Sequence, residues 1–527
     1  MMLQVNNVGL RFASRTLFQD VNLKFEHGNC YGLIGANGAG KSTFLKILSK
    51  EIEPSSGDVS IGKNERLSVL KQNHHEFDDH TAINVVIMGN KKLYDIMQKR
   101  EKLYQQTEFT EADGILIGEL EADFAELNGW EAESNAAILL VGLGLDNNLH
   151  EKLMSELTGP EKVKVLLAQA LFDNPDILLL DEPTNNLDIT AKLWLEEFLI
   201  NFPNTVIVVS HDRYFLNKVC TYTIDIDFER LTLFVGNYDF WYESSQLILK
   251  QMKDSNKKKE DKIKELQDFI RRFSANASKS KQATSRKKSL EKIELDEIKA
   301  STRKYPFINF KIERPLGKEI LEIKGLNKKS EDGYFLKDFR LTVSSGEKIA
   351  LIGNEQAITM LFKILNEEEE ADAGYIKWGT TVIKGYYPKN YDNFFTKKVS
   401  LVDWLKDYSN DTSDSFLRGF LGRMLFSGEE ALKMVDVLSG GEKARLMFSK
   451  LMLSNANVLM FDDPTNHLDI ETITSLNNEM IEYRGCILFY SHDHHLLNSV
   501  ANRIIEIKED GTYVDKMCGY DEYLNIN

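Results

Sequence analysis

One segment of the 527-residue chain has residue types and spacing suited to binding a phosphate group. It reads GANGAGKST from Gly35 to Thr43, after the apolar run YGLIG and before the helix-like FLKIL, and it fits the pattern G-x-x-x-x-G-K-[ST]. The glycines allow backbone N–H groups to surround a phosphate, and Lys41 supplies a positive charge to the β- and γ-phosphates. Ser42 supplies a hydroxyl to Mg²⁺. We expect the phosphates to be lined by Gly35, Asn37, Gly38, Gly40, Lys41, Ser42 and Thr43.

Carboxylate and imidazole groups follow two other apolar runs. ILLLDE places Asp181 at the end of an expected strand, beside the metal, and Glu182 one residue later. Glu182 is the natural base or orienter for an attacking water molecule. His211 follows TVIVVS, where it could contact the γ-phosphate. A lone histidine is more often structural, but SHD occurs twice, so we predict that Lys41, Glu182 and His211 carry the chemistry.

The chain contains an internal repeat in which one copy has lost its phosphate loop. LTGPEK and LSGGEK, DEPTNNLD and DDPTNHLD, and the two SHD triplets are each separated by 281 residues. The counterpart of the phosphate loop, GNEQAITM from Gly353 to Met360, lies 318 residues after the first loop and has no lysine. The first copy therefore has about 37 additional residues between its phosphate loop and LTGPEK.

Short apolar runs separated by helical spacing predict an α/β fold with buried parallel strands in each copy. We expect two P-loop domains in tandem, at residues 1–241 and 306–527, joined by a linker at 242–305. The additional residues of the first domain lie at about 80–142, where apolar residues at helical spacing predict a projecting helical arm. A packed helical subdomain is the alternative.

The linker has a different composition from the two domains. Residues 250–304 contain 18 Lys and Arg against 9 Asp and Glu, whereas the whole chain has a net charge of −16. Apolar side chains at 3-4-3 spacing, a coiled-coil seam, occur at Ile263, Leu266, Ile270 and Phe273. We predict two antiparallel helices with a basic tip that contacts nucleic acid. The alternative is a solvated spacer, because runs of charge usually lie on solvated faces.

Composition excludes several other classes of protein. Hydrophobic residues make up 42% and charged residues 28%, as in globular proteins. No apolar run approaches the roughly 20 residues that span a bilayer, and the N-terminus lacks the pattern of a signal peptide. The four cysteines have no C-x-x-C spacing, which favours reduced thiols. We expect a cytoplasmic protein that does not contact membranes.

Taken together, these motifs resemble the ATP-binding cassette family, and more closely its ABC-F branch of twin ATPases that associate with ribosomes. LSGGEK resembles the cassette signature, DEPTNNLD the Walker B motif and SHD the switch histidine. Phe12 resembles the aromatic that stacks on adenine, and Gln72 the Q-loop residue. The resemblance implies two ABC-type P-loop ATPase domains that use ATP and Mg²⁺, the metal being held by Ser42, Gln72 and Asp181.

The family places each ATP between the phosphate loop of one cassette and the signature of the other. This implies a monomer whose own cassettes pair, so that the first phosphate loop faces Ser439, Gly440 and Gly441. We expect ATP hydrolysis mainly at this intact composite site. The serine hydroxyl and the glycine amides would hold the γ-phosphate there.

The other composite site departs from the family pattern on both faces. Ser330 stands in the place of the adenine-stacking aromatic, Lys389 in the Q-loop and Asp463 in the place of the Walker B glutamate. The opposing signature has Thr158 for serine and Pro160 for the second glycine, and proline has no N–H to donate. We predict that this site has stopped hydrolysing ATP.

The resemblance implies a translation factor that closes on ATP, contacts the ribosome and P-site tRNA through its arm and linker, and leaves after hydrolysis. Antibiotic resistance by ribosome protection, or a regulatory scaffold that ATP locks with little turnover, are the alternatives. The linker residues expected at the phosphates of rRNA and tRNA are Arg271, Arg272, Lys279, Lys281, Arg286, Lys287 and Lys288.

Overall fold

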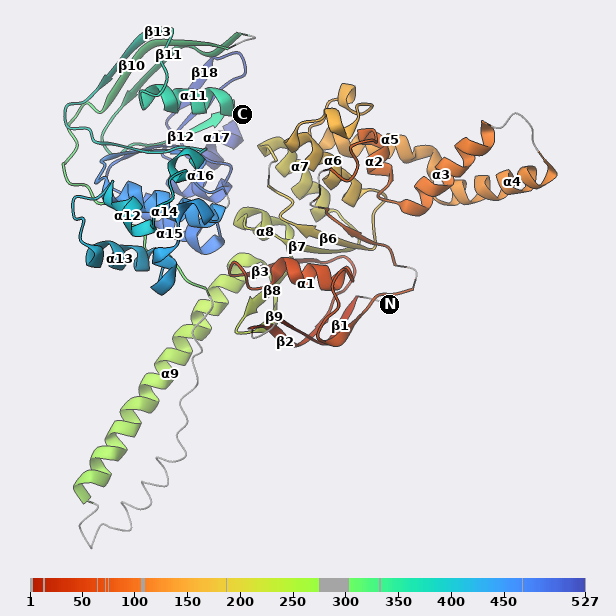
Figure 1. Cartoon of the computed structure of the whole chain (residues 1–527), viewed down its shortest axis with the longest axis horizontal. Coiled ribbons are helices and arrows are strands. Elements are labelled where there is room, and N and C mark those ends of the chain that lie inside the picture. The colour runs from red at the N-terminus through yellow and green to blue at the C-terminus, as the bar shows by residue number, and fades with distance from the viewer. Residues whose placement is uncertain are drawn as a thin grey trace. The chain divides into compact units, whose positions relative to one another are not determined.

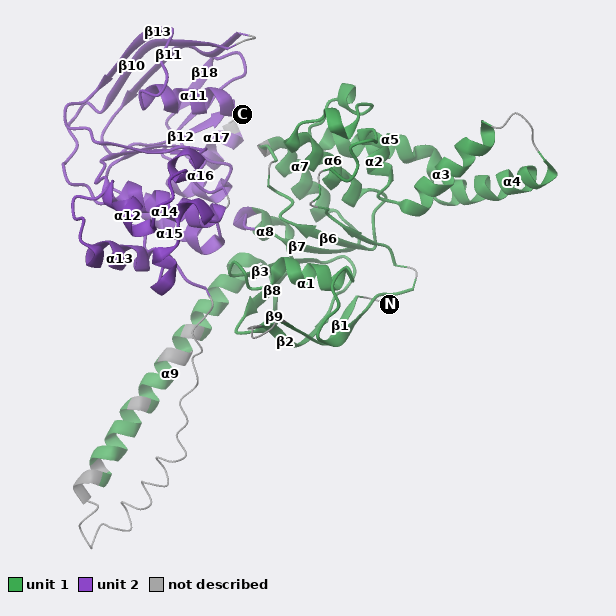
Figure 2. Ribbon diagram, viewed as in Figure 1, with its two compact units in different colours: residues 1–210, 215–302 green, residues 211–214, 303–527 purple. Residues whose placement is uncertain are grey.

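A computed structural model describes residues 3–12, 15–63, 65–71, 73, 75–105, 110–185, 187–273, 303–330, 333–466 and 468–526. The chain divides into two compact units (Figure 2). The first unit comprises residues 1–210 and 215–302, and the second comprises residues 211–214 and 303–527.

The first unit contains two sheets, as far as its described residues show. An antiparallel sheet has the order β2-β1-β4, and a larger one has the order β5-β6-β7-β3-β8-β9, with all strands parallel except β9. The central strands β3, β6 and β7 consist mainly of apolar residues buried on both faces, as parallel strands usually do, and β6 ends in the half-buried Asp181. The strands are β1 (Gln4–Phe12), β2 (Arg15–Lys24), β3 (Cys30–Gly35), β4 (Ser56–Ser60), β5 (Leu67–Val69), β6 (Ile177–Asp181), β7 (Thr205–Val209), β8 (Tyr222–Asp227) and β9 (Arg230–Val235).

Helices connect these strands, as parallel neighbours require (Figure 1). In the described residues of the first unit, the helices are α1 (Lys41–Leu48), α2 (Ala82–Ile87), α3 (Lys91–Tyr104), α4 (Glu111–Glu126), α5 (Ala132–Gly142), α6 (Gly159–Leu171), α7 (Ile189–Ile200), α8 (Arg213–Val219, whose first two residues group with the second unit) and α9 (Tyr238–Phe273). Three short 3₁₀ turns lie at Gly129–Glu131, Asn147–Leu149 and Met154–Glu156.

The second unit repeats both sheets with the orders β11-β10-β13 and β14-β15-β16-β12-β17-β18. Its strands are β10 (Leu321–Ser330), β11 (Gly333–Val343), β12 (Lys348–Gly353), β13 (Ala373–Trp378), β14 (Lys384–Tyr387), β15 (Val458–Asp462), β16 (Cys486–Tyr490), β17 (Arg503–Ile507) and β18 (Tyr513–Lys516). Its helices are α11 (Glu355–Leu365), α12 (Leu401–Lys406), α13 (Asp414–Arg423), α14 (Gly440–Leu453), α15 (Ile470–Glu482), α16 (His494–Val500) and α17 (Tyr520–Ile526). The 3₁₀ turns lie at Asp392–Phe395, Gly428–Leu432 and Val435–Val437.

Strand register identifies equivalent positions in the two copies. Val69 of β5 pairs with Leu179 of β6, and Tyr386 of β14 pairs with Met460 of β15. Because Leu179 and Met460 differ by the repeat distance of 281, Val69 and Tyr386 are counterparts. Three residues beyond each of them stand Gln72 and Lys389, so the sheet itself places Lys389 at the Q-loop position.

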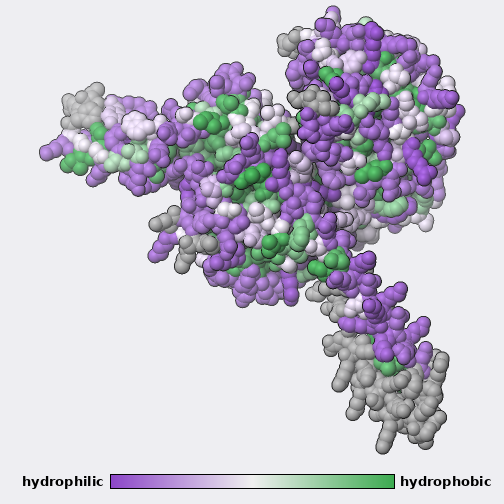
Figure 3. Space-filling model, turned by 180° about the vertical axis from the view of Figure 1, so that it is seen from behind, coloured by the Kyte–Doolittle hydropathy of each residue, from purple (hydrophilic) through white to green (hydrophobic). Residues whose placement is uncertain are grey.

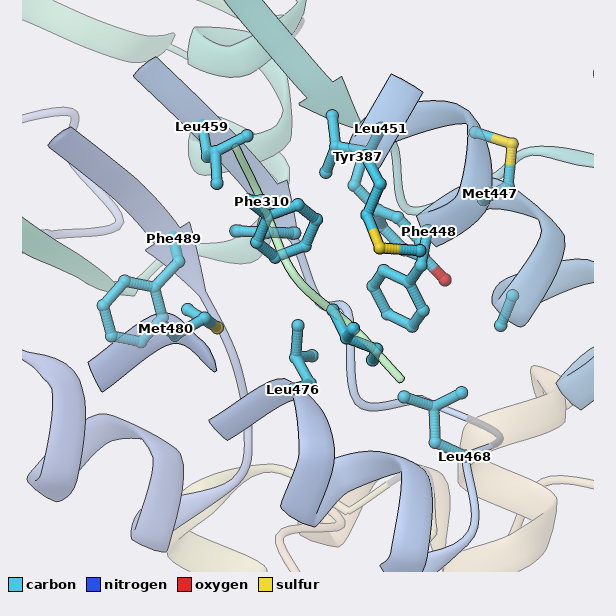
Figure 4. Close-up of a cluster of buried hydrophobic side chains, with 14 of the residues drawn as sticks. Phe310, Tyr387, Met447, Phe448, Leu451, Leu459, Leu468, Leu476, Met480 and Phe489 are labelled. Atoms are coloured by element: carbon cyan, nitrogen blue, oxygen red, sulfur yellow. The ribbon is translucent and has the colours of Figure 1, made fainter. Parts of the chain in front are cut away.

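The segment after the linker forms part of the core of the second unit (Figure 4). Phe310 is 6% exposed and lies among side chains of the sheet and of helices α14 and α15, with its ring centroid 5.8 Å from that of Phe461. Its amide donates to the carboxylate of Glu479 at 2.7 Å. Arg303 forms an ion pair with Glu471 at 3.1 Å. The segment that follows the linker is therefore held to the core of the second unit from Arg303 onward.

Helices α3 and α4 form a hairpin that projects from the body of the first unit (Figure 1). The Arg100 guanidinium lies 3.7 Å from the centre of the Phe124 ring and donates to Glu121 at 2.8 Å. These contacts tie α3 to the C-terminal part of α4. Helices α2 and α5, in contrast, pack against α6. The inserted region thus consists of a projecting hairpin between two helices that belong to the body.

The described part of the linker is the long helix α9, and the face seen in Figure 3 is largely hydrophilic. On the predicted seam, Leu266 is 5% exposed, and Ile263 and Ile270 are half-buried. The expected return helix and basic tip lie outside the described residues. Among the helices in the described ranges, none has the length and apolar character needed to cross a membrane.

Candidate active site

The first phosphate loop lies between strand β3 and helix α1. Gly38 and Gly40 have φ angles of 74° and 104°, which side chains rarely tolerate. Lys41 is 9% exposed, and its Nζ donates to the carbonyls of Gly35 at 2.8 Å and Ala36 at 3.4 Å. The ammonium group is thus held over the loop at the N-terminus of a helix, an arrangement suited to a phosphate.

Asp181 and Glu182 lie at the same edge of the sheet as this loop, because β6, β7 and β3 are parallel neighbours. Asp181 is the last residue of β6 and is half-buried. Glu182 has a φ of 53°, and its amide donates to the carbonyl of Val209 at 2.9 Å. The chain therefore turns sharply after Asp181, which fixes both carboxylates at the strand end.

The remaining predicted residues of this cassette are described to different extents. Ser42 is exposed in the first turn of α1, and Asn37 is exposed in the loop. His211 is half-buried, follows β7 by two residues and groups with the second unit. Phe12 ends β1, but its side chain lies outside the described structure, as does all of Gln72.

The signature serine of the second cassette caps a helix. Ser439 is the N-cap of α14, and its amide and hydroxyl each donate to Glu442 at 2.9 Å. Burial alone would raise the pKa of Glu442, but hydrogen bonds from Lys433 and Ser439 hold it below its ordinary value. Gly440 and Gly441 form the first turn, whose N–H groups have no partner within the helix and are available to an anion.

The signature of the first cassette has the same cap but one donor fewer. Thr158 caps α6, and its hydroxyl donates to Glu161 at 2.8 Å. Pro160 occupies the second position of this helix, where Gly441 stands in α14. The proline ring suits the first turn and removes the N–H that would face a phosphate.

The phosphate loop of the second cassette is replaced by helix. β12 ends at Gly353 and α11 begins at Glu355, whereas five residues separate β3 from α1. Helices α1 and α11 end at equivalent positions, Leu48 and Leu365, so the additional residues of α11 lie at its N-terminus, where the first cassette has its loop. In this alignment Ile358, which is 0% exposed, occupies the position of Lys41. Counting back from the helix end also places Thr359 at the position of Ser42.

A buried acidic group lies beneath this helix. Asp462, the counterpart of Asp181, is 0% exposed at the end of β15. Burial raises the pKa of Asp462 to about 6, against the opposing effects of the nearby Thr359 hydroxyl and the positive charge of Lys389. Glu355, at the start of α11, forms an ion pair with Lys389. Sequence reasoning overlooked Glu355 and Thr359 because it matched the loops forward from the strand.

Each unit thus has the fold of a P-loop nucleotide-binding domain, and the chain is a twin-cassette protein. A family model described as ABC transporter matches residues 18–185 and 336–466, and a second with the same description matches residues 224–310.

Known proteins similar to the chain show its family. The uncharacterized ABC transporter ATP-binding protein YkpA of Bacillus subtilis is 61% identical over 526 residues, which cover 99% of this chain and 97% of YkpA. ABC transporter F family member 5 of Arabidopsis thaliana is 30% identical, with coverage of 99% and 77%. The chain belongs to the ABC-F branch of the ATP-binding cassette family and is an ATPase, which confirms the resemblance and fold class predicted from its sequence.

A solved structure supports the tandem fold. The chain matches a structure described as the complex of archaeal ribosomal stalk protein aP1 and archaeal ribosome recycling factor aABCE1 with a TM-score of 0.62. The match covers 99% of this chain and 91% of the other at 17% identity, and at that identity it shows the fold alone.

Proposed function

We propose that this protein is a translation factor that binds the ribosome in its ATP-bound form and leaves after hydrolysis. The observation that carries this proposal is the combination of twin cassettes with two insertions, the α3–α4 hairpin and the basic linker that begins with α9. The α3–α4 hairpin and α9 are long helical elements, and the sequence of the linker has an excess of positive charge suited to RNA phosphates.

Two of the three proteins compared above support a role at the ribosome, one through its family and one through its described partner. One belongs to the F family, and the other is described as a ribosome recycling factor in complex with a ribosomal stalk protein. We extend that partner to this chain as part of the proposal, with rRNA and P-site tRNA as the nucleic acids contacted.

The proposed chemistry belongs to the first phosphate loop paired with the second signature. Lys41 and the loop amides bind the phosphates, and Phe12 stacks on adenine. Ser42, Gln72 and Asp181 hold Mg²⁺, which when bound neutralises charge on the phosphate oxygens. Glu182 orients the attacking water and accepts its proton, while His211 contacts the γ-phosphate.

The opposing signature completes this site in the proposal. The amides of Gly440 and Gly441 and the hydroxyl of Ser439 would donate to the γ-phosphate. To do so, the hydroxyl must rotate away from Glu442, its partner in the structure. Since a γ-phosphate offers new acceptors only when ATP is bound, closure depends on ATP.

Sedimentation of the full-length protein with ribosomes tests the proposal. Glu182→Gln should preserve ATP binding and block hydrolysis, so it should pellet with ribosomes in ATP and remain in the supernatant in ADP. The matched control is Glu182→Gln combined with Lys41→Ala, which should remain in the supernatant with either nucleotide. Equal recovery in ATP and ADP would contradict an ATP-gated cycle.

A second arm of the experiment tests the linker. Charge removal at Arg271, Arg272, Lys279, Lys281, Arg286, Lys287 and Lys288 should weaken pelleting in a salt-dependent manner and leave ATP hydrolysis without ribosomes unchanged. The control removes three lysines nearer the base of α9, Lys257, Lys258 and Lys259. If both variants bind ribosomes equally well, the tip is not the RNA contact.

A further inference from the structure

The second cassette contains an anion of its own where a nucleotide phosphate would be expected. Glu355 forms an ion pair with Lys389, and its Oε2 lies 3.5 Å from His492 Nε2. The Tyr490 hydroxyl donates to the same oxygen at 3.3 Å and lies 2.9 Å from His492 Nε2. One carboxylate is therefore held by a lysine, a histidine and a phenol.

The partners of Glu355 come from the positions that surround a γ-phosphate in the first cassette. Lys389 is the counterpart of Gln72 by strand register, and His492 lies 281 residues after His211. These are the Q-loop and switch positions. The Glu355 carboxylate thus contacts the side chains that would otherwise sense the terminal phosphate of ATP.

The backbone on either side of Glu355 forms hydrogen bonds within the protein and does not form a phosphate loop. Asn354 caps α11, and its Oδ1 accepts from the Ala357 amide at 3.0 Å. The Asn354 amide donates to the carbonyl of Ile507 at 2.7 Å. Glu355 itself stands at the first position of α11, where the helix dipole favours a negative charge.

The Glu355 carboxylate stays ionised, and its negative charge disfavours a phosphate at the same site. The hydrogen bond with His492, foremost, and the contact with Lys389 hold the pKa of Glu355 down to about 2, against the effect of burial. Asp462 contributes a second acidic group nearby, and Ile358 supplies no charge in the place of the phosphate-binding lysine. A triphosphate would have to displace the ion pair and unwind the first turn of α11.

We propose that the Glu355 carboxylate permanently takes the place of the γ-phosphate in the second cassette. This cassette binds no nucleotide, and Lys389 and His492 are held in position by Glu355 instead of ATP. The protein therefore uses one ATP for each cycle. The inference concerns nucleotide stoichiometry and local stability, so it does not depend on the ribosome as partner.

Counting bound nucleotide tests the first part. Full-length Glu182→Gln protein, incubated with radiolabelled ATP and Mg²⁺ and separated from free nucleotide, should retain one ATP for each chain. Adding Lys41→Ala should abolish saturable binding. A second ATP for each chain, or saturable ATP binding that survives Lys41→Ala, would overturn the proposal. The result is independent of whether ribosomes are bound.

Thermal unfolding tests whether Glu355 holds the site together. Glu355→Gln removes the carboxylate that pairs with Lys389, the two side chains being 42% and 32% exposed, and should lower the Tm of the second unit by about 2 °C or more. Glu367→Gln is the matched control, because Glu367 also pairs with a lysine, Lys384 at 2.7 Å, but is 77% exposed. Its Tm should stay within about 1 °C of the wild type.

A double-mutant cycle separates this contact from a general loss of stability. Lys389→Met should cost much less in the Glu355→Gln protein than in the wild type, because the pair is already broken. Additive losses, or an unchanged Tm in Glu355→Gln, would show that the carboxylate does not organise the switch positions. Near-ultraviolet circular dichroism of each variant verifies that it is folded.

Discussion

Glu182 and Asp463 have the same strained backbone in the two cassettes. Their φ angles are 53° and 51°, and their amides donate to the carbonyls of Val209 and Tyr490, each at 2.9 Å. Such a conformation costs on the order of 1 kcal/mol in a residue with a side chain, and it persists because the neighbouring strand end holds it. The two cassettes thus share one backbone conformation at this position and differ in the side chain that it carries.

Replacing the glutamate at this position should remove catalysis at the first site. Glu182→Gln retains the shape of the side chain but not its basicity, so kcat should fall by about 10²–10⁴-fold. Asp463→Asn, at the equivalent position, should change kcat less than about twofold, since that site is proposed to bind no ATP. Phosphate release at saturating ATP measures both. Comparable losses in the two variants would contradict the assigned asymmetry.

Variants of the two signature N-caps should distinguish an effect on stability from an effect on catalysis. Ser439→Ala and Thr158→Ala each remove an N-cap and should cost about 1 kcal/mol in the free energy of unfolding. Only Ser439→Ala should also reduce kcat/KM, by at least about tenfold, because Ser439 alone is proposed to face a γ-phosphate. Urea unfolding and ATPase rates provide the two readouts. A similar kinetic loss in Thr158→Ala would argue for hydrolysis at the other site.

The buried carboxylate of the second cassette should make stability depend on pH. The pKa of Asp462 is raised from 3.8 to about 6, so the folded state binds the proton more tightly than the unfolded state. The contribution to stability is complete below about pH 4 and is lost as the pH rises through 6.

Asp462→Asn should remove that dependence. At pH 7.5 the variant should gain on the order of 2 kcal/mol in the free energy of unfolding, with a much smaller gain at pH 4.5. Urea unfolding at the two pH values measures the difference. A variant destabilised at pH 7.5 would show that the ionised carboxylate stabilises the second unit.

Two glycines of the first phosphate loop should respond differently to alanine. At Gly38, with φ 74°, a Cβ would meet open space, so Gly38→Ala should cost about 1–2 kcal/mol from backbone strain alone. At Gly40, with φ 104°, a Cβ would lie 3.3 Å from Leu17 and Phe18. Gly40→Ala should cost about 1–3 kcal/mol more.

Thermal or urea unfolding measures these two costs, and ATP titration should show weaker binding for Gly40→Ala. Equal stability of the two variants would mean that the loop moves away from Leu17 and Phe18 at little cost.

The fold class, and the strand, loop and helix that hold the first phosphate-loop motif, could be predicted from the sequence because their signals are local. Lys41 belongs to a nine-residue motif, and Asp181 and Glu182 close one buried strand. The two copies could be recognised from blocks repeated at a single distance. Short-range geometry, a strand followed by a turn and a helix, then places these residues with little freedom.

The second site was decided by tertiary structure. Sequence comparison showed that lysine and glycines were missing, but not that α11 would grow into the gap. The phosphate loop needs glycines at left-handed φ, and the second cassette lacks the two that correspond to Gly38 and Gly40. With an asparagine as N-cap, the helical conformation of this segment has the lower free energy. The Glu355 partners Lys389, Tyr490 and His492 lie at least 34 residues away in the chain. Only the assembled sheet, which brings the ends of β14 and β16 beside the start of α11, gives that carboxylate its environment.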